Sequence, residues 1–487
     1  MIVKDRLFIG GDWVEPEGTE VIQVISPVTE EPVAEVPHGS PADIDRAVAA
    51  ARSAFERGPW PRYGPAERAD LLVALGRAIA ARREEFARTI TAQNGSLLSF
   101  NRDAQVPGTM AFLDYYAQLT REFAFEEERP GLFGNRAIVR REPVGVVGAI
   151  IAWNGPLLQA AIKLAPAIAT GCTAVLKPAP EAPLDSYLLA ECLQEAGLPD
   201  GVINIVAAGR EVGEHLVTHP DVDKITLTGS TAAGRRIAAL CGGDLRRVTL
   251  ELGGKSAAII CPDVDLPTVI PRLVAASTRV SGQACASQTR ILVPASVHDE
   301  VVDGLVEGSR TLRIGDPTDP ATDIGPLVAE RQRRRVEGYI ALGRAEGARV
   351  AVGGGRPAHL GRGWYVEPTV FVDVKNSMRI AQEEIFGPVI AVIPYHDADE
   401  AVAIANDSSY GLSGSVWTGD RDRALDIARR VRTGTITVNG FTFEFNCPFG
   451  GYKNSGIGRE LGPEGFDAFL EYKTITVQDD SAAIFGS

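Results

Sequence analysis

The chain has 487 residues, more than one hydrophobic core usually organises, so two or three domains are expected. An apolar content of 45% and a charged content of 23% are ordinary for a soluble globular protein. The net charge of −14 argues against general binding to nucleic acid or to an anionic membrane, so we expect neither partner.

Six cysteines are scattered along the chain without a CxxC pair. This spacing favours neither a zinc site nor a disulfide framework, so we expect no bound metal and a reducing compartment, the cytoplasm. The first residues lack the apolar core of a signal peptide, and no stretch approaches the roughly 18 apolar residues that span a membrane. A location away from membranes is therefore expected.

The first 40 residues alternate short apolar runs with Gly and Pro, which predicts β-hairpins. A helix is expected from Pro41, because Ser40 can cap it and Asp43 suits its third position. Segments rich in Ala, Leu, Arg and Glu predict further helices over residues 65–93 and 105–127.

From residue 144 the pattern changes to alternating strands and helices, which is typical of a parallel sheet built from βαβ units. Strands are expected over 144–151, 173–176, 203–206 and 224–228, with helices over 158–170, 183–196 and 211–218. A second series has strands over 256–261, 290–293 and 389–394 and helices over 265–280, 297–311, 328–346 and 398–406. A nucleotide-binding domain followed by a second α/β domain is predicted.

Residues 472–477 alternate like a strand, yet nothing after them in the sequence could pair with them. An unpaired strand edge is a liability that proteins usually cover. Pairing with another subunit is one way to cover it.

Two features suit a nucleotide. The strand over 224–228 runs into Gly229, Ser230 and Gly234, before a helix expected over 235–240, and such a turn can bind pyrophosphate. Its GxxxxG spacing differs from the GxGxxG fingerprint, so an ordinary tight turn is the alternative. Lys177 ends another strand at the carboxyl edge of the sheet, where ligands bind, although a solvated surface lysine is the alternative.

Two residues suit catalysis. Cys285 lies in a small polar segment between two apolar runs, and its thiolate would be a nucleophile, although a buried structural cysteine is the alternative. Glu251 stands between two leucines, where desolvation would raise its pKa toward neutrality and suit a general base. A glutamate on the solvated side of a strand end is the alternative.

Several motifs together resemble those of the NAD(P)-dependent aldehyde dehydrogenase superfamily, in family order and over essentially the whole chain. They are Asn154 in IAWN, Glu251 in LELGGKS, Cys285 in GQACASQTR, Glu384 and Phe386 in EEIFGPV, and PFGGYKNSGIG at 448–458. The resemblance implies an α/β fold in three parts and a homo-oligomer, either a dimer or a tetramer. These parts are a Rossmann-type dinucleotide-binding domain over 1–120 and 143–252, a catalytic domain over 253–453, and a small β oligomerisation element over 121–142 and 470–487.

The resemblance also implies a reaction. Cys285 adds to an aldehyde, and the oxyanion is held by the Asn154 amide and the Cys285 N–H. Hydride passes to the nicotinamide and leaves a thioester, which water activated by Glu251 hydrolyses to a carboxylic acid. The alternatives are a semialdehyde dehydrogenase that acylates coenzyme A, a branch that typically lacks this glutamate, and a catalytically silent structural protein on the same scaffold.

For the cofactor, the resemblance implies that Lys177 and Glu384 bind the riboses, Ser230 the pyrophosphate, and Phe386 and Trp153 the nicotinamide end. Many NAD-preferring members carry Glu three residues after the lysine, whereas this chain has Pro180 there and Glu181 one place later. We expect NAD, with NADP as the alternative, because no further Arg or Lys lies between residues 177 and 187.

For the substrate, many members carry phenylalanine where this chain has Gly155, and Ile162 stands where tryptophan is common. Gln159 is expected at a nearby wall position of the tunnel. Three phenylalanines could line its entrance or pack into the core: Phe441, Phe443 and Phe445. Apart from Lys163, neither wall segment carries a cation, so we predict a bulky apolar aldehyde and no obvious partner for a carboxylate-bearing one.

Overall fold

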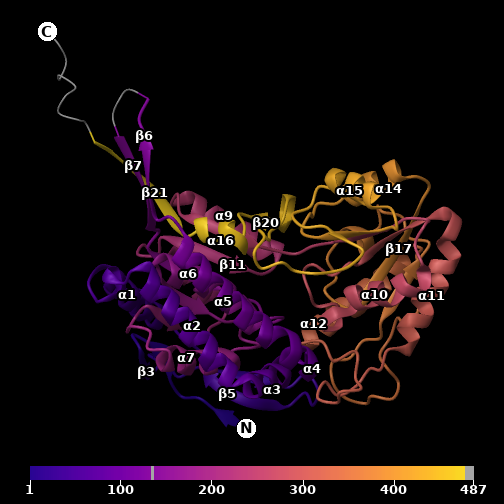
Figure 1. The fold of residues 1–487 in the computed structure, drawn as a ribbon. Helices are drawn as coiled ribbons and strands as arrows, with labels where there is room; N and C mark the ends of the chain where they lie inside the picture. Colours follow the sequence, from indigo (N-terminus) through magenta and orange to yellow (C-terminus); the bar gives the residue numbers. More distant parts are fainter. Residues whose placement is uncertain (133–135, 478–487) are drawn as a thin grey trace.

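Residues 1–132 and 136–477 are described by a computed structural model, in which two lobes lie side by side (Figure 1). The first lobe holds an eight-stranded sheet in the order β20-β12-β11-β8-β9-β10-β2-β3. The second holds a seven-stranded sheet in the order β15-β16-β17-β14-β13-β18-β19. The two predicted α/β units are therefore present, while the domain boundaries stay a prediction.

Five parallel strands form the centre of the first sheet: β12 (Arg247–Glu251), β11 (Lys224–Thr228), β8 (Val146–Ile150), β9 (Thr173–Lys177) and β10 (Ile203–Ile205). Antiparallel strands extend both ends: β20 (Gly456–Ile457), β2 (Leu7–Ile9) and β3 (Asp12–Val14). The N-terminal hairpin predicted from Gly and Pro is thus confirmed and adds to this sheet.

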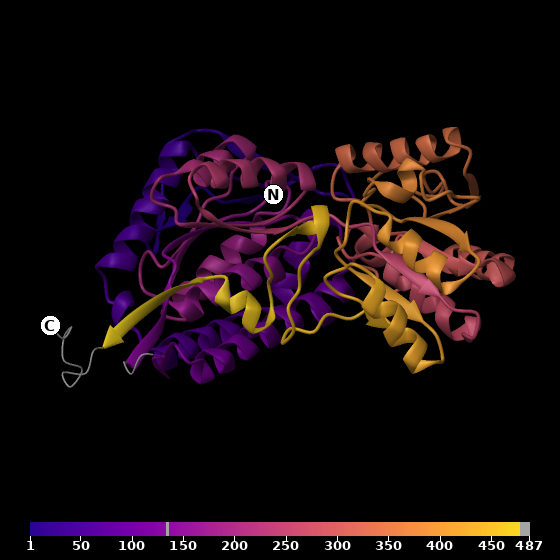
Figure 2. The ribbon, with the colours of Figure 1, turned by 90° about the horizontal axis from the view of Figure 1, so that it is seen from above.

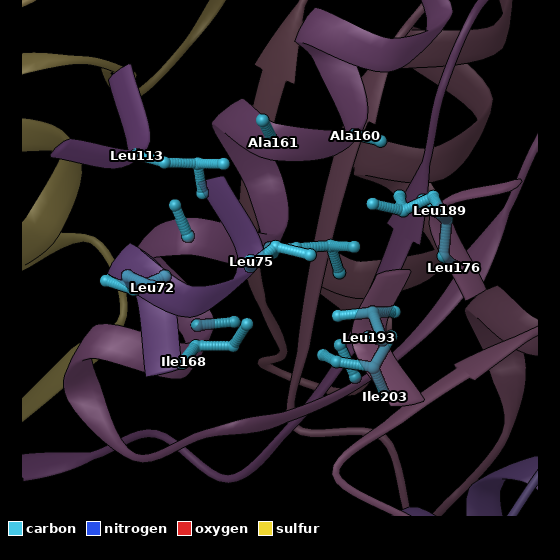
Figure 3. Packing of buried hydrophobic residues seen from close by; sticks show 14 of the residues in the cluster. Leu72, Leu75, Leu113, Ala160, Ala161, Ile168, Leu176, Leu189, Leu193 and Ile203 are labelled. Carbon is cyan, nitrogen blue, oxygen red and sulfur yellow. The ribbon is translucent and has the colours of Figure 1, made fainter. Parts of the chain in front are cut away.

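Helices bury apolar side chains on both faces of this sheet. One face carries α2 (Pro65–Ala81), α5 (Val106–Glu122), α6 (Pro156–Thr170) and α7 (Leu184–Glu195), whose leucines and alanines interdigitate over β9 and β10 (Figure 3). The other face carries α1 (Pro41–Glu56), α8 (Arg210–Thr218) and α9 (Thr231–Gly243). The shorter elements are η1 (Trp60–Arg62), α3 (Arg83–Asn94), α4 (Leu98–Phe100) and the π-helical η2 (Asn101–Gln105).

The second sheet is parallel except for its first strand. Its strands are β15 (Arg349–Val352), β16 (Thr369–Val372), β17 (Val389–Tyr395), β14 (Arg290–Pro294), β13 (Ala257–Ile260), β18 (Gly414–Trp417) and β19 (Thr437–Val438). One face packs on α10 (Leu266–Thr278) and α11 (His298–Thr311). The other packs on α12 (Glu330–Ala345), α13 (Arg379–Gln382), α14 (Ala398–Asn406) and α15 (Arg421–Arg430).

Two small sheets complete the fold. One contains β1 (Ile2–Val3), β5 (Pro32–Pro37) and β4 (Val21–Ile25). The other, β21-β7-β6, is a ribbon of β6 (Glu126–Pro130), β7 (Arg136–Pro143) and β21 (Leu470–Val477) that projects from the first lobe. The C-terminal chain returns from the second lobe, across the first and through α16 (Gly462–Asp467), to reach it (Figure 2).

The sequence-based elements are largely confirmed, with three corrections. Ser40 caps α1 in a capping box with Asp43, as expected. The helix predicted over 65–93 is two helices that meet at Arg82, and α9 begins at Thr231, before the expected residue 235. The C-terminal strand has a partner, because the earlier strand β7 pairs along its whole length. Parts of the predicted oligomerisation element, 133–135 and 478–487, lie outside the described residues.

No helix in the described part of the chain is long and apolar enough to cross a membrane.

Candidate active site

A cavity of about 360 Å³ lies between the two lobes. Its walls come from residues just after β8, β11 and β12 in the first sheet and from residues just before β14 and β17 in the second. The carboxyl ends of one parallel sheet therefore face the amino ends of the other. The predicted site residues that line it are Trp153, Asn154, Gly229, Ser230, Glu251, Cys285, Glu384 and Phe386.

Asn154 is held with its amide N–H groups toward the cysteine segment. Its Nδ2 donates to the Gln283 carbonyl at 2.9 Å, and its Oδ1 accepts from Gln159 Nε2 at 2.8 Å. Gln159 Oε1 accepts in turn from the Ala152 N–H at 2.8 Å, which fixes the orientation of both amides. Gln159, expected on the tunnel wall, therefore orients Asn154.

Cys285 is half-buried and lines the cavity. Burial raises the pKa of its thiol to about 12, and the Glu384 and Glu251 carboxyls add to the rise. The cysteine backbone is packed closely against the LELGGKS turn, since a Cβ added at Gly254 would stand 2.5 Å from the Cys285 carbonyl oxygen. A thiol with this pKa is protonated at neutral pH.

Glu251 ends β12 with both carboxyl oxygens buried and without a hydrogen-bond partner among the described residues. Burial and then the Glu460 carboxyl raise the pKa of Glu251 well above its usual value, while Lys163 and Arg459 lower it. An unpaired, desolvated carboxyl beside a thiol is suited to take a proton from water.

Lys163 lies behind Glu251, in the core, and does not line the tunnel wall. Its Nζ is 2.6 Å from Glu460 Oε1, which also accepts from Thr226 Oγ1 at 3.2 Å. This buried ion pair joins α6 to the C-terminal segment and sets the charge around Glu251. The sequence motifs did not reveal it, because the partners come from distant parts of the chain.

Glu384 and Phe386 close the cavity from the second lobe. Glu384 Oε1 accepts from the Gly254 N–H at 2.9 Å, and burial raises the pKa of this carboxyl to about 7. Phe386 has a φ of +63°, which is strained for an aromatic residue, and its ring meets Trp153 edge-on at 5.4 Å. The aromatic pair forms one wall.

The expected pyrophosphate turn is a helix N-terminus. Ser230 caps α9, with its Oγ accepting from the Ala233 N–H at 3.3 Å, so the positive end of the helix points at the cavity. Gly234 lies inside the helix and does not line the cavity. It is needed for packing, because a Cβ there would stand 2.5 Å from both Leu252 methyl groups.

Lys177 lies at the end of β9, outside the cavity wall. Its Nζ donates to the Ala208 carbonyl at 2.7 Å and to Pro178 at 3.0 Å, and burial lowers the pKa of the amine to about 8. Glu181, four residues on, forms an ion pair with Arg331 of α12.

Three residues of α12 line the cavity and were missed by the motif analysis: Arg331, Gln332 and Arg335. Arg335 donates to the backbone carbonyls of Glu384 and Ile385, which holds α12 against the EEIFGPV segment. Arg331 and Arg335 therefore give this wall of the cavity two cations, which suit an anionic ligand. The spacing of Arg331 and Arg335 on one face of the helix was the only signal in the sequence.

The predicted substrate-pocket residues lie beyond Asn154, outside the cavity wall. A Cβ at Gly155 would meet only Gln159 Nε2 at 3.7 Å and Gln105 Oε1 at 4.0 Å, so a methyl group would fit there in ordinary contact. Ile162 packs against the core of the first lobe.

The three phenylalanines divide between the two expected positions. Phe445 packs against that same core and contacts Phe112, with ring centroids 5.7 Å apart. Phe441 and Phe443 contact each other at 5.4 Å, and Phe443 is 39% exposed. Two of the three rings therefore remain toward the surface.

Comparison with known proteins gives a consistent result. Residues 13–475 match the model of the aldehyde dehydrogenase family. The chain is 49% identical over 474 residues to geranial dehydrogenase of Castellaniella defragrans, covering 97% of this chain and 99% of that one. A Mycobacterium tuberculosis aldehyde dehydrogenase complexed with NAD+ is 49% identical, with a TM-score of 0.97 over 99% of this chain and 100% of that one.

A cysteine-to-alanine mutant of aldehyde dehydrogenase C from Pseudomonas syringae, complexed with NAD+ and octanal, is 42% identical. Its TM-score is 0.94 over 97% of this chain and 96% of that one. With the fold, the family model and these relatives in agreement, the chain belongs to the aldehyde dehydrogenase family.

Proposed function

We propose that this protein oxidises a bulky aldehyde to a carboxylic acid with NAD, using Cys285 as nucleophile. The proposal rests on one observation, that a thiol, an unpaired carboxyl and an oriented amide line the same cavity. The Cys285 thiol gives up its proton to water as Sγ adds to the carbonyl carbon, and the oxyanion that forms accepts hydrogen bonds from Asn154 Nδ2 and the Cys285 N–H. Loss of hydride leaves a thioester, which water deprotonated by Glu251 cleaves to the acid.

The residues around the cavity fit a dinucleotide, which supplies the hydride acceptor when bound. The α9 N-terminus at Ser230 and the α12 arginines suit a pyrophosphate, and the wall formed by Trp153 and Phe386 suits the nicotinamide end. Glu384 would accept from a ribose hydroxyl, and Lys177 would bind the adenosine ribose. NAD-bound relatives support the same cofactor.

The product decides between this function and its rivals. Without coenzyme A, we expect one NADH and one free carboxylic acid for each aldehyde oxidised, because Glu251 can deprotonate the water that cleaves the thioester. Acyl-coenzyme A as the required product would support the acylating alternative. No turnover with any aldehyde would support a silent structural protein.

A bulky apolar substrate is favoured by the missing side chain at Gly155, where an added Cβ would meet only the ends of two amide side chains. Geranial in one relative's name and octanal in another's complex support this preference. We expect kcat/KM to rise from acetaldehyde to geranial-sized aldehydes, since each buried methylene contributes roughly 0.8 kcal/mol. Gly155→Phe should remove the rise and spare acetaldehyde, and an unchanged profile would show that this wall does not set specificity.

NAD is proposed over NADP because Glu181 follows Lys177 by four residues and would bring a carboxylate near the 2′ group of an adenosine ribose bound at Lys177, while Arg331 is paired with that carboxylate. We expect Glu181→Gln to raise kcat/KM with NADP by about tenfold or more relative to NAD, since it removes a repelling charge and frees Arg331. If the ratio of kcat/KM with NADP to kcat/KM with NAD does not change, Glu181 does not lie near the 2′ group of the cofactor.

Assembly and location are part of the proposal. Within residues 1–132 and 136–477, the outer edges of β21 and β19 pair with no other strand, and a homo-oligomer would pair them. Six unpaired cysteines suit a reducing cytoplasm.

A further inference from the structure

Lys255 is a buried lysine whose ammonium group has no hydrogen-bond partner. It lies in the LELGGKS turn between β12 and β13 with 2% of its surface exposed, and its Nζ meets no acceptor among the described residues. An ammonium group has three donors and no acceptor, so burying it without a partner costs free energy. A ligand from outside the chain would remove this cost.

The other buried lysines in the described part of the chain each have an acceptor. Lys163 and Lys177 have the ion pair and the carbonyl acceptors given above. Lys224 Nζ donates to Thr249 Oγ1 at 2.7 Å. Burial of a lysine in this protein is therefore accompanied by a hydrogen bond or an ion pair, and Lys255 is the exception.

A small cavity adjoins Lys255 inside the second lobe. Its volume is about 10 Å³, which is room for one occupant of the size of a water molecule. It shares no lining residue with the cavity that holds Cys285. A phosphate or a carboxylate, with several heavy atoms, exceeds this space. The walls come from residues 255–257, 290, 405, 410–413 and 431–433.

The wall of this cavity is positively charged. It includes Lys255, Arg290 and Arg432 but, among the residues that the structure describes, no aspartate or glutamate. All three guanidinium nitrogens of Arg290 already donate to neutral oxygen atoms, those of three backbone carbonyls and of the Asn376 amide. Because no carboxylate on this wall balances the charges, the space favours an anion over a neutral water molecule.

Two hydroxyl groups add to the donors at this cavity. Ser256 and Thr433 line it, and their Oγ and Oγ1 atoms are buried without a hydrogen-bond partner in residues 1–132 and 136–477. A hydroxyl group can rotate to donate its hydrogen. With the ammonium group of Lys255, two segments far apart in the sequence therefore bring unpaired donors to one small space. A monatomic anion accepts from several donors and needs no acceptor in return.

The protonation of Lys255 depends on the charges around it. Burial and then the Arg290 guanidinium lower the pKa of the amine to about 7, while the Glu384 and Glu383 carboxyls raise it. An anion in contact with the amine would favour its charged form.

We propose that this cavity is a halide site, at which one chloride ion accepts hydrogen bonds from Lys255 Nζ, Ser256 Oγ and Thr433 Oγ1. The ion joins the LELGGKS turn to the segment before β19 and stabilises the second lobe. The site goes beyond the proposed function, because it binds neither the aldehyde nor the cofactor.

Bromide is the crystallographic probe, because it takes the place of chloride and scatters X-rays anomalously. Crystals of the wild type grown in sodium bromide should show an anomalous peak in contact with Lys255 Nζ. Lys255→Met, which keeps most of the stem and removes the charge, should lose this peak. A water molecule at this position in the wild type, without an anomalous peak, would overturn the site.

Binding in solution is measured by the Tm of the wild type as sodium chloride replaces sodium gluconate at constant ionic strength. Gluconate is too large for the cavity. We expect a saturable rise in Tm of about 1–3 °C, because an ion that binds only the folded protein stabilises it. Lys255→Met should lose this rise. Thr433→Val, which removes one donor, should raise the apparent Kd for chloride by about threefold or more.

Lys375→Met is the matched control, because it removes an exposed lysine between β16 and α13 of the same lobe. It should keep both the bromide peak and the chloride dependence of Tm. A bromide peak without a saturable rise in Tm would mean binding at crystal concentration only and would overturn the proposal. So would an equal rise in the wild type and Lys255→Met. If Lys255→Met does not fold, the wild-type peak and Thr433→Val decide the question.

Discussion

Cys285 lies in surroundings that favour its neutral thiol, because burial and two carboxyls raise its pKa to about 12. At pH values below this pKa, the thiolate fraction of Cys285 rises about tenfold for each unit by which the pH increases. In a Cys447→Ser background, which removes the exposed cysteine, we expect the rate of iodoacetamide alkylation at Cys285 to climb steadily from roughly pH 7 to 9.5. Peptide mass spectrometry measures it. A plateau below pH 8 would mean that the thiolate is already formed without ligand.

The pH dependence of turnover should follow the charges around Glu251. Its pKa is raised by burial and by Glu460 and lowered by Lys163. A base must be deprotonated, so kcat falls as the pH drops through this pKa. Lys163→Met removes the lowering charge and should move the acid limb to higher pH. Glu460→Gln removes a raising charge and should move it to lower pH. Shifts of the same sign in both variants would contradict this account.

At the residue scale, the sequence predicted the centre of the site and missed its surroundings. Cys285, Glu251 and Asn154 stand in local motifs, and the cavity brings them together. The Lys163–Glu460 and Arg331–Glu181 ion pairs join distant segments of the chain, so no local motif predicts either contact. The sequence predicted a wall position for Gln159, whereas its side chain donates to Asn154. This hydrogen bond depends on the turn before α6, and the sequence did not predict the conformation of that turn.

At the scale of elements, tight glycine turns hold the cysteine segment in place. A Cβ at Gly254 would stand 2.5 Å from the Cys285 carbonyl, so backbone must shift to admit it. We expect Gly254→Ala to lower the free energy of unfolding by roughly 1–3 kcal/mol and to reduce kcat. Urea unfolding and steady-state kinetics measure the two effects.

Gly242→Ala is the matched control, because this α9 glycine has nothing within 4 Å of its Cβ position. It should leave kcat unchanged and raise stability by about 0.5–1 kcal/mol through helix propensity. Equal behaviour of the two variants would show that the turn tolerates a side chain.

The long amphipathic helices and the central buried strands were predictable from their periodicity. The short strands were not: β20 has only two residues, and β18 is a brief buried run with Gly and Ser. The early start of α9 was missed because Gly234 looks like a turn residue, whereas its missing side chain makes room for Leu252.

At the scale of the whole molecule, the projecting ribbon carries exposed apolar side chains. Ile475 and Val477 of β21 are 40% and 39% exposed on one face of its edge strand. We expect the wild type to have a solution mass above the 51.9 kDa of one chain. Ile475→Lys with Val477→Lys should shift it toward the monomer, because charges blunt an open edge. Light scattering after size exclusion measures this mass.

Val21→Lys, at an exposed valine of β4, serves as the control and should leave the assembly intact. A monomeric wild type would contradict the proposal. So would an unchanged mass in the β21 variant.

The most direct test of the central claim is mass spectrometry of Glu251→Gln mixed with NAD+ and a reactive aldehyde. The variant keeps the thiol and the Asn154 amide but loses the base that hydrolyses the thioester. The account predicts one burst of NADH per subunit, followed by slow turnover, and a thioester on the peptide that contains Cys285, whose added mass is that of the aldehyde less the hydrogen lost as hydride and the hydrogen lost as a proton. Steady turnover at the wild-type rate, or a burst without acylated Cys285, would contradict it.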